Sequence, residues 1–187
     1  MVEYNLIRTN RKTLSIIIKP DGRVEVRAPL RASRAYIDSF VNSKTSWINS
    51  KLKELKQIRS QQRIIQLTPD EVQAYCKKAL VYFQEKCSYY ANKMGVEYEK
   101  IRVSKAKTRW GSCNSRGTLS FTYRLMFARE ELIDYVIVHE LAHRKEMNHS
   151  HRFWAVVEET LPDYKERRKA LRDFEHQYDF RICHSDK

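Results

Sequence analysis

Histidine is concentrated in one short segment of the chain. Six histidines occur among 187 residues, and four of them lie between His139 and His151. His139 and His143 are four residues apart, and Glu140 directly follows the first of them. One turn of helix would place both imidazoles on the same face, where they can share a metal ion at about 2.0–2.1 Å. Glu140 would lie beside that ion, where a general base can act on water, so the spacing indicates metal-assisted hydrolysis.

The segment that carries this HExxH signature is predicted to be a buried helix. Residues 135–138 read Tyr-Val-Ile-Val and are apolar on every side. A buried His or Glu needs a partner for its polar atoms, and a metal ion supplies one. We expect one Zn²⁺ per chain, because imidazole nitrogens suit zinc better than Mg²⁺.

His149 is the expected third ligand. It lies ten residues after His139, as in the longer pattern HExxHxxGxxH, although Glu146 takes the place of the glycine. Asn148 tolerates a left-handed conformation, so the helix can end there and return His149 to the metal.

Other residues compete for the third position. His151 follows two residues later, and Glu158 or Glu159 on the next helix would give a site with two histidines and one carboxylate. Three protein ligands leave a fourth position for water, which favours a catalytic over a structural zinc.

The net charge of +13 is unevenly distributed along the chain. Residues 1–60 hold 13 Lys or Arg against 5 Asp or Glu, and residues 61–128 hold 12 against 5. Residues 129–187 hold 11 against 13, so the signature lies outside the basic part. A basic surface attracts polyanions, which makes nucleic acid a candidate partner, although no nucleic-acid-binding module is recognisable.

Composition restricts the class of protein. The 42% hydrophobic and 32% charged fractions exclude a disordered or low-complexity chain. No apolar run is long enough to span a membrane, and the N-terminus does not resemble a signal peptide. The four cysteines form no CxxC pair, so we expect reduced thiols in a cytoplasmic protein.

Hydrophobic patterning predicts a mixed α+β fold. Residues 4–28 indicate a small sheet with a hairpin at Pro20-Asp21-Gly22, followed by one amphipathic helical stretch from about residue 37 to 55. The polar segment 56–63 is a plausible boundary, so we expect an N-terminal β-hairpin and helix unit over 1–60 and a catalytic domain over 61–187, or one integrated domain.

The catalytic part alternates between helices and short strands. Thr68-Pro69-Asp70-Glu71 forms a capping box, and the helix it starts can run to Met94, where Gly95 would end it. Two short strands are expected at 101–104 and 118–121. Further helices are expected from about 128, 150 and 162, which completes an α+β order.

Several motifs together resemble the YgjP-like metallopeptidase-domain family over nearly the whole chain. They are Arg109-Trp110-Gly111-Ser112-Cys113, Leu119-Ser120-Phe121, His139-Glu140-Leu141-Ala142-His143, Asn148-His149-Ser150, Phe153-Trp154, Asn10-Arg11-Lys12, Asp21-Gly22-Arg23-Val24 and Leu161-Pro162-Asp163-Tyr164. The resemblance implies a zincin-like fold whose HExxH helix packs on a small β-sheet. It also implies zinc held by His139, His143 and His149, with Glu140 as catalytic base.

By the same resemblance, an extended peptide substrate would add to a sheet edge above the metal helix, and Thr118–Phe121 is the expected edge. Ser120 on this strand, with Arg109 and Arg116 near it, are candidate substrate-binding residues. Arg144 and Lys145, directly after the signature, are expected on a solvated helix face. Cys113 is expected to be a structural thiol rather than a nucleophile.

Three functions remain open at this stage. The first is a zinc peptidase; WLM-domain and SprT-type zinc proteases, which act on proteins at DNA, look like more distant relatives. The second is a metal-dependent pyrophosphohydrolase of UTP, because some members of the resembled family carry that label. The third is a non-catalytic zinc protein that associates with nucleic acid through its basic surface.

Overall fold

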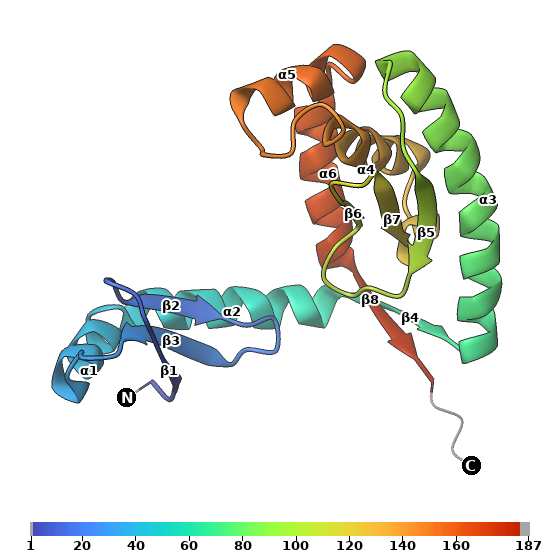
Figure 1. Ribbon diagram of the computed structural model, residues 1–187. Coiled ribbons are helices and arrows are strands. Elements are labelled where there is room, and N and C mark those ends of the chain that lie inside the picture. Colours follow the sequence, from blue (N-terminus) through green and yellow to red (C-terminus); the bar gives the residue numbers. More distant parts are fainter. Residues whose placement is uncertain (1, 184–187) are drawn as a thin grey trace. The chain divides into compact units, whose positions relative to one another are not determined.

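The chain divides into two units, residues 1–62 and residues 63–187 (Figure 1). The computed structural model describes residues 2–183. Each unit encloses a hydrophobic core of its own. No helix within the described residues is long and apolar enough to cross a membrane.

A three-stranded sheet forms the base of the N-terminal unit. Its strands are β1 (Asn5–Thr9), β2 (Ser15–Ile18) and β3 (Val24–Pro29), in the order β1-β3-β2. β2 and β3 form the predicted antiparallel hairpin. In its turn, the Lys19 amide donates to the Arg23 carbonyl at 2.8 Å, and the Gly22 amide donates to the Lys19 carbonyl at 2.9 Å. Gly22 takes φ +88° in this turn, a conformation that glycine adopts without steric cost. β1 joins β3 in parallel.

Two helices pack on this sheet, where the sequence pattern predicts one continuous stretch. α1 (Arg34–Ser43) ends at Lys44, whose φ of −107° and ψ of 6° lie outside the helical range, and α2 (Thr45–Gln61) follows at once. The predicted helical stretch is therefore confirmed as helical, but it is divided at Lys44 into two helices. The break allows Ile37, Val41 and Ile48 to enter one core, where each is at most 1% exposed.

The long helix α3 (Pro69–Met94) opens the C-terminal unit after β4 (Arg63–Leu67) and confirms its predicted ends. Thr68 Oγ1 accepts from the Glu71 amide at 3.2 Å, and the Glu71 carboxylate accepts from the Thr68 amide at 2.7 Å. Gly95 follows in a left-handed conformation, with φ +61°, and ends the helix.

The C-terminal unit contains a three-stranded sheet with the strand order β5-β7-β6. Its strands are β5 (Lys100–Ser104), β6 (Gly111–Cys113) and β7 (Thr118–Thr122). One of its strands, β6, contacts the helix α4 (Glu130–Ala142). β7 pairs in parallel with β5 and antiparallel with β6, so both of its edges are used. The expectation that residues 118–121 form a free sheet edge is therefore wrong, and β6 is the edge strand beside α4.

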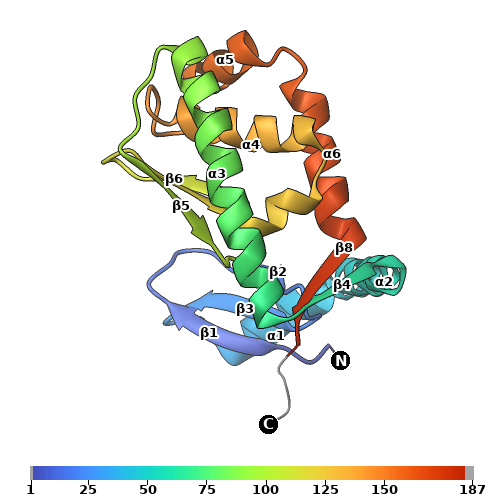
Figure 2. The ribbon, with the colours of Figure 1, turned by 90° about the vertical axis from the view of Figure 1, so that its right-hand side faces the viewer.

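The remaining elements complete the α+β fold. They are the 3₁₀ helix η1 (Tyr123–Phe127), α4 (Glu130–Ala142), α5 (His151–Thr160), α6 (Tyr164–Gln177) and β8 (Tyr178–Ile182). α4 packs between α3 and α6 (Figure 2), and β8 pairs in parallel with β4. The predicted α+β architecture, with the HExxH helix packed against a small β-sheet, is confirmed.

Candidate metal centre

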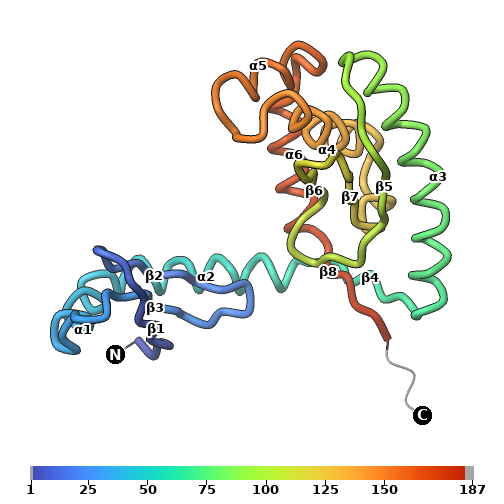
Figure 3. Tube along the Cα trace, in the orientation of Figure 1, coloured from blue at the N-terminus to red at the C-terminus, as the bar shows by residue number. Residues whose placement is uncertain are grey.

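The HExxH segment lies at the C-terminal end of α4. Residues 135–138 are buried, which fixes α4 inside the core, and His139 follows in the next turn. The helix ends at Ala142, and His143 caps it with helical dihedral angles. The chain then forms a loop to Ser150, whose hydroxyl accepts from the Phe153 amide at the start of α5 (Figure 3). This loop carries His149 back towards α4.

Three imidazoles converge at this point. His139, His143 and His149 each offer a ring nitrogen, and these nitrogens all lie within 4.8 Å of one another. The Nε2 atoms of His139 and His149 are 3.0 Å apart. Two nitrogens bound to one tetrahedral zinc ion lie about 3.3 Å apart, so the spacing fits a shared metal.

The hydrogen bonding of His143 favours the same function. Its Nδ1 lies 3.1 Å from the carbonyl oxygen of Glu146, which can only accept, so Nδ1 carries the proton. Nε2 is then the unprotonated nitrogen that a metal requires. Glu146, which replaces the glycine of the longer pattern, therefore contributes through its backbone.

Burial favours the neutral form of His139 and His143. The pKa of His139 is lowered to about 3, chiefly by burial and to a smaller extent by the neighbouring His143 and His149. Its Nδ1 is buried with no hydrogen-bond partner among the described residues, so nothing there stabilises an imidazolium. The pKa of His143 is also lowered by burial, against the opposing hydrogen bond to Glu146. Neutral imidazole is the form that binds a metal.

A single aromatic ring supports all three imidazoles. Phe153 is fully buried, and its centroid lies 4.9, 4.6 and 4.7 Å from the rings of His139, His143 and His149. Trp154 lies 5.7 and 5.8 Å from His139 and His149 and stacks on Tyr164. Trp154 is thus packed against two rings of the cluster.

Glu140 lies in an apolar environment beside β6. It is 5% exposed, and burial raises its pKa to about 8, while the positive charge of Arg109 opposes that rise. Gly111 faces it closely: a Cβ at position 111 would stand 2.7 Å from both Cγ and Oε1 of Glu140. Real Cβ atoms do not approach so closely, so glycine at this position makes room for the carboxylate.

The competing third-ligand candidates lie outside the cluster. Within residues 2–183, the group able to hold a metal contains neither His151 nor Glu158 or Glu159. His151 is exposed at the first position of α5, and Glu158 instead lies 3.7 Å from Lys165.

The three substrate-binding candidates lie in or next to the strands β6 and β7. Arg109 lies two residues before the start of β6 and lines a small pocket of about 50 Å³ together with Ser112 and Ser120. Ser120 is half-buried in the central strand, where it pairs with Ser112. Arg116 is exposed in the loop between β6 and β7. Of the three, only Arg109 acts on Glu140 through its charge.

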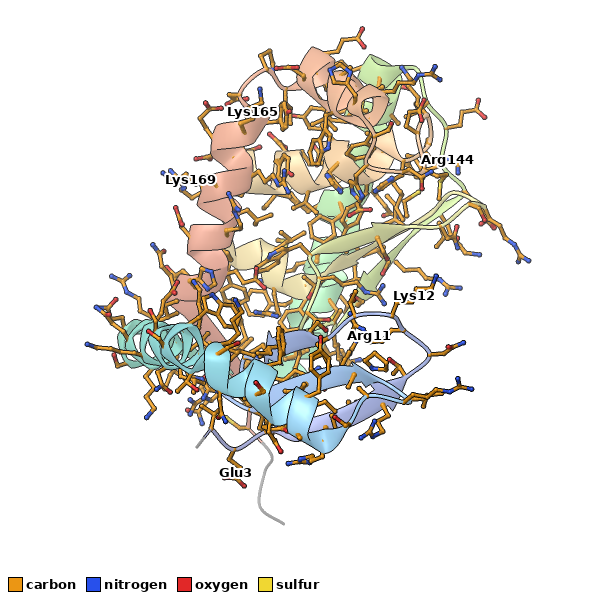
Figure 4. The ribbon with its side chains drawn as sticks, turned by 90° about the vertical axis from the view of Figure 1, so that its left-hand side faces the viewer. Glu3, Arg11, Lys12, Arg144, Lys165 and Lys169 are labelled. Atoms are coloured by element: carbon orange, nitrogen blue, oxygen red, sulfur yellow. The ribbon has the colours of Figure 1, made fainter. Side chains whose placement is uncertain are left out.

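Arg144 differs from its expected place on a solvated helix face. α4 has already ended, and the guanidinium donates from Nε to the Glu97 carbonyl at 2.9 Å and from Nη1 to the Ser115 carbonyl at 3.1 Å (Figure 4). Arg144 therefore ties the loop between β6 and β7 to the segment that precedes β5, and its donors are engaged by the protein itself.

A pocket beside the cluster was not anticipated from the sequence. It has a volume of about 230 Å³ and lies between the start of β6, α4 and α6. Glu140 and His139 form one end of it, and Arg168 and Arg172 of α6 form part of its wall. The helical periodicity of α6 was visible in the sequence, but nothing in the local pattern indicated which elements its polar face meets.

No curated protein matches the chain. Two solved structures are similar: the metallopeptidase zymogen of Pyrococcus abyssi abylysin and the metallopeptidase zymogen of Methanocaldococcus jannaschii jannalysin. The first is 22% identical with a TM-score of 0.47 and covers 51% of this chain and 97% of its own. The second is 20% identical with a TM-score of 0.44 and covers 49% and 95%.

The model of one protein family matches most of the chain. The matched residues are 12–73 and 68–174, which include the N-terminal hairpin, β6, β7 and all three clustered histidines. The description of this family names a peptidase and gives no support to a nucleotide or nucleic-acid partner. The chain belongs to the YgjP-like metallopeptidase domain family.

Proposed function

We propose that this protein is a zinc-dependent peptidase in which His139, His143 and His149 hold one zinc ion and Glu140 is the general base. The observation that carries the proposal is the convergence of three imidazoles beside a buried carboxyl group. The family supports the peptidase activity, and the all-nitrogen donor set favours zinc over the oxygen-seeking Mg²⁺ or Ca²⁺.

When bound, zinc supplies Lewis-acid activation of water and of the scissile carbonyl group. Glu140 accepts a proton from the attacking water and delivers it to the nitrogen of the leaving amine. The pKa of Glu140 is about 8 in the metal-free protein, and a bound cation would lower it towards neutral pH, where a group can both accept and release a proton. The positive charge of Arg109 favours the ionised form that starts the reaction.

The edge strand β6 is the proposed docking site for the peptide backbone. Within the described residues, β6 pairs with β7 on one side and with no strand on the other. An extended peptide can therefore add to it by main-chain hydrogen bonds. Because Gly111 at the start of β6 touches Glu140, a peptide on this edge passes the general base.

The first test combines metal analysis with cleavage of an unfolded protein. Purified protein is expected to hold about one zinc per chain by elemental mass spectrometry, and fragments of the substrate are expected by peptide mass spectrometry. Glu140→Gln should keep the zinc and lose the fragments. Fragments that persist in Glu140→Gln, or a protein that takes up no zinc, would refute the proposed centre.

A further inference from the structure

The pocket beside His139 is lined by apolar and aromatic side chains, by the carboxyl groups of Glu140 and Glu175, and by two arginines of α6. The residues that surround its volume of about 230 Å³ are Trp110, Gly111, Tyr135, Val136, His139, Glu140, Arg168, Leu171, Arg172 and Glu175. A volume of this size accommodates one amino-acid side chain. The pocket adjoins the proposed general base, so an occupant would belong to a residue next to the scissile bond.

Arg168 and Arg172 lie on one face of α6. They are four residues apart, and a helix brings such positions within about 5–6 Å at Cβ. Two like charges at this spacing destabilise a helix slightly, and an anion bound between them would remove that cost. Guanidinium groups also match the planar geometry of a carboxylate.

Neither guanidinium forms a salt bridge within the described part of the chain. No carboxylate there lies within 4.0 Å of Arg168 or Arg172, whereas the neighbouring Arg167 pairs with Asp163 at 2.9 Å. Glu175 also lines the pocket, but it makes no salt bridge with either arginine within the described residues.

The positive charges of both arginines act on Tyr135, which also lines the pocket. Their charges lower the pKa of the Tyr135 hydroxyl, which burial nonetheless raises to about 12. Arg168 also acts on His139, and its guanidinium carbon lies 4.8 Å from the ring centroid of Trp154. The positive field therefore reaches the region where a substrate would meet the metal cluster.

We propose that this pocket is a subsite for a carboxylate group of the peptide, with Arg168 and Arg172 as specificity-determining residues. The inference rests on the proposed peptidase function and names its substrate class. The carboxylate comes either from an Asp or Glu side chain or from the C-terminus of the peptide. The first source describes an endopeptidase with acidic preference, and the second describes a carboxypeptidase.

Binding can be measured separately from cleavage. Zinc-loaded Glu140→Gln protein is titrated by calorimetry with three peptides: Ala-Ala-Glu-Ala-Ala and Ala-Ala-Gln-Ala-Ala, both acetylated and amidated, and the second peptide with a free C-terminus. Charge-assisted hydrogen bonds should make a carboxylate-bearing peptide bind about tenfold more tightly than the blocked Gln peptide. Whichever of the two carboxylate-bearing peptides gains affinity identifies the source of the carboxylate.

The variants assign that difference to the pocket. Arg172→Gln should remove most of it, and adding Arg168→Gln should remove the rest. Lys169→Gln is the matched control, because Lys169 is exposed on α6, lies outside the pocket and projects away from α4 (Figure 4). Arg172→Gln is the decisive variant, since Arg168 also stacks on Trp154 and its loss could disturb the histidines.

The outcomes separate this inference from the peptidase function. Equal binding of all three peptides, or a preference that survives in the double variant, would overturn the subsite. In active enzyme, the same preference should appear as about a tenfold difference in kcat/KM. If binding shows the preference but no peptide or protein is cleaved, the subsite stands and the peptidase proposal fails.

Discussion

The backbone of Gly111 lies against the carboxyl group of Glu140. A Cβ atom at position 111 would stand 2.7 Å from Cγ and Oε1 of Glu140 and 3.0 Å from its Cδ. One residue of the edge strand therefore determines where the proposed general base can sit. This contact joins β6, where the peptide is expected to bind, to α4, where the proton transfer is expected to occur.

Gly111→Ala should reduce activity while leaving the metal in place. The added methyl group displaces the Glu140 carboxylate, and a shift of about 1 Å in a catalytic group can lower the rate about 100-fold. The three heavy atoms nearest to a Cβ at position 111 all belong to Glu140, so zinc content should remain near that of the unaltered protein. Cleavage rates and elemental analysis of the same samples provide the measurement.

Ser112→Ala, one residue further along β6, is the matched control for this variant. Position 112 lies in the same strand and pairs with Ser120 instead of meeting Glu140. The Ser112→Ala variant should therefore keep most of the activity of the unaltered protein. If Gly111→Ala were as active as Ser112→Ala, the close packing at Gly111 would have no catalytic consequence.

His149 and His151 should respond differently to removal. His149 belongs to the three-histidine group, whereas His151 is exposed at the start of α5. His149→Ala should weaken zinc binding more than about 100-fold, beyond the effect typical of lost supporting contacts. His151→Ala should leave the affinity unchanged in competition with a chromogenic chelator. The reverse result would transfer the role of third ligand to His151.

The sequence predicts the elements that carry local signals and misses those defined by distant contacts. The capping box at Thr68 and the left-handed Gly95 set both ends of α3, and both are recognisable from neighbouring residues. The HExxH spacing likewise needs only one helix. The approach of His149 was predictable because one short loop connects it to α4.

Long-range pairing could not be predicted in the same way. β6 has only three residues and no alternating pattern, so nothing local shows that it covers the edge of β7 and makes residues 118–122 a central strand. β4 and β8 lie more than a hundred residues apart, and they form their parallel pair only in the folded unit. The contact of Gly111 with Glu140 and the pocket between β6, α4 and α6 depend on such long-range pairings.

The ring of Phe153 is expected to support metal affinity as well as stability. It is fully buried and lies within 4.9 Å of all three imidazole centroids. Phe153→Leu preserves most of the volume and should cost about 1 kcal/mol of unfolding free energy. The imidazoles would lose their common flat support, so zinc affinity should also fall, by about tenfold.

Phe83→Leu separates these two effects. Phe83 is also fully buried in the same core, but its ring packs on Phe121 at 5.2 Å instead of on the histidines. It should lose a comparable amount of stability and keep its zinc affinity. An equal loss of affinity in both variants would show that general loosening of the core, rather than support by Phe153, controls the metal.

The metal-free protein should show opposite pH effects from His139 and Glu140. The pKa of His139 falls from 6.5 in the unfolded chain to about 3, so its contribution to stability is complete above pH 6.5 and is lost as pH falls towards 3. The pKa of Glu140 rises from 4.5 to about 8. Its contribution is complete below pH 4.5 and is lost as pH rises to about 8, because the unfolded chain ionises first.

Glu140→Gln isolates the second effect, because glutamine keeps the shape and carries no charge. In the presence of a chelator, the variant should be about 1–3 kcal/mol more stable than the unaltered protein at pH 8, and the difference should disappear near pH 4. Urea unfolding at several pH values measures this directly. With zinc bound, the cation favours the carboxylate, so the advantage of the variant at pH 8 should shrink. A difference that does not change with pH would mean that Glu140 is already ionised in the folded, metal-free protein.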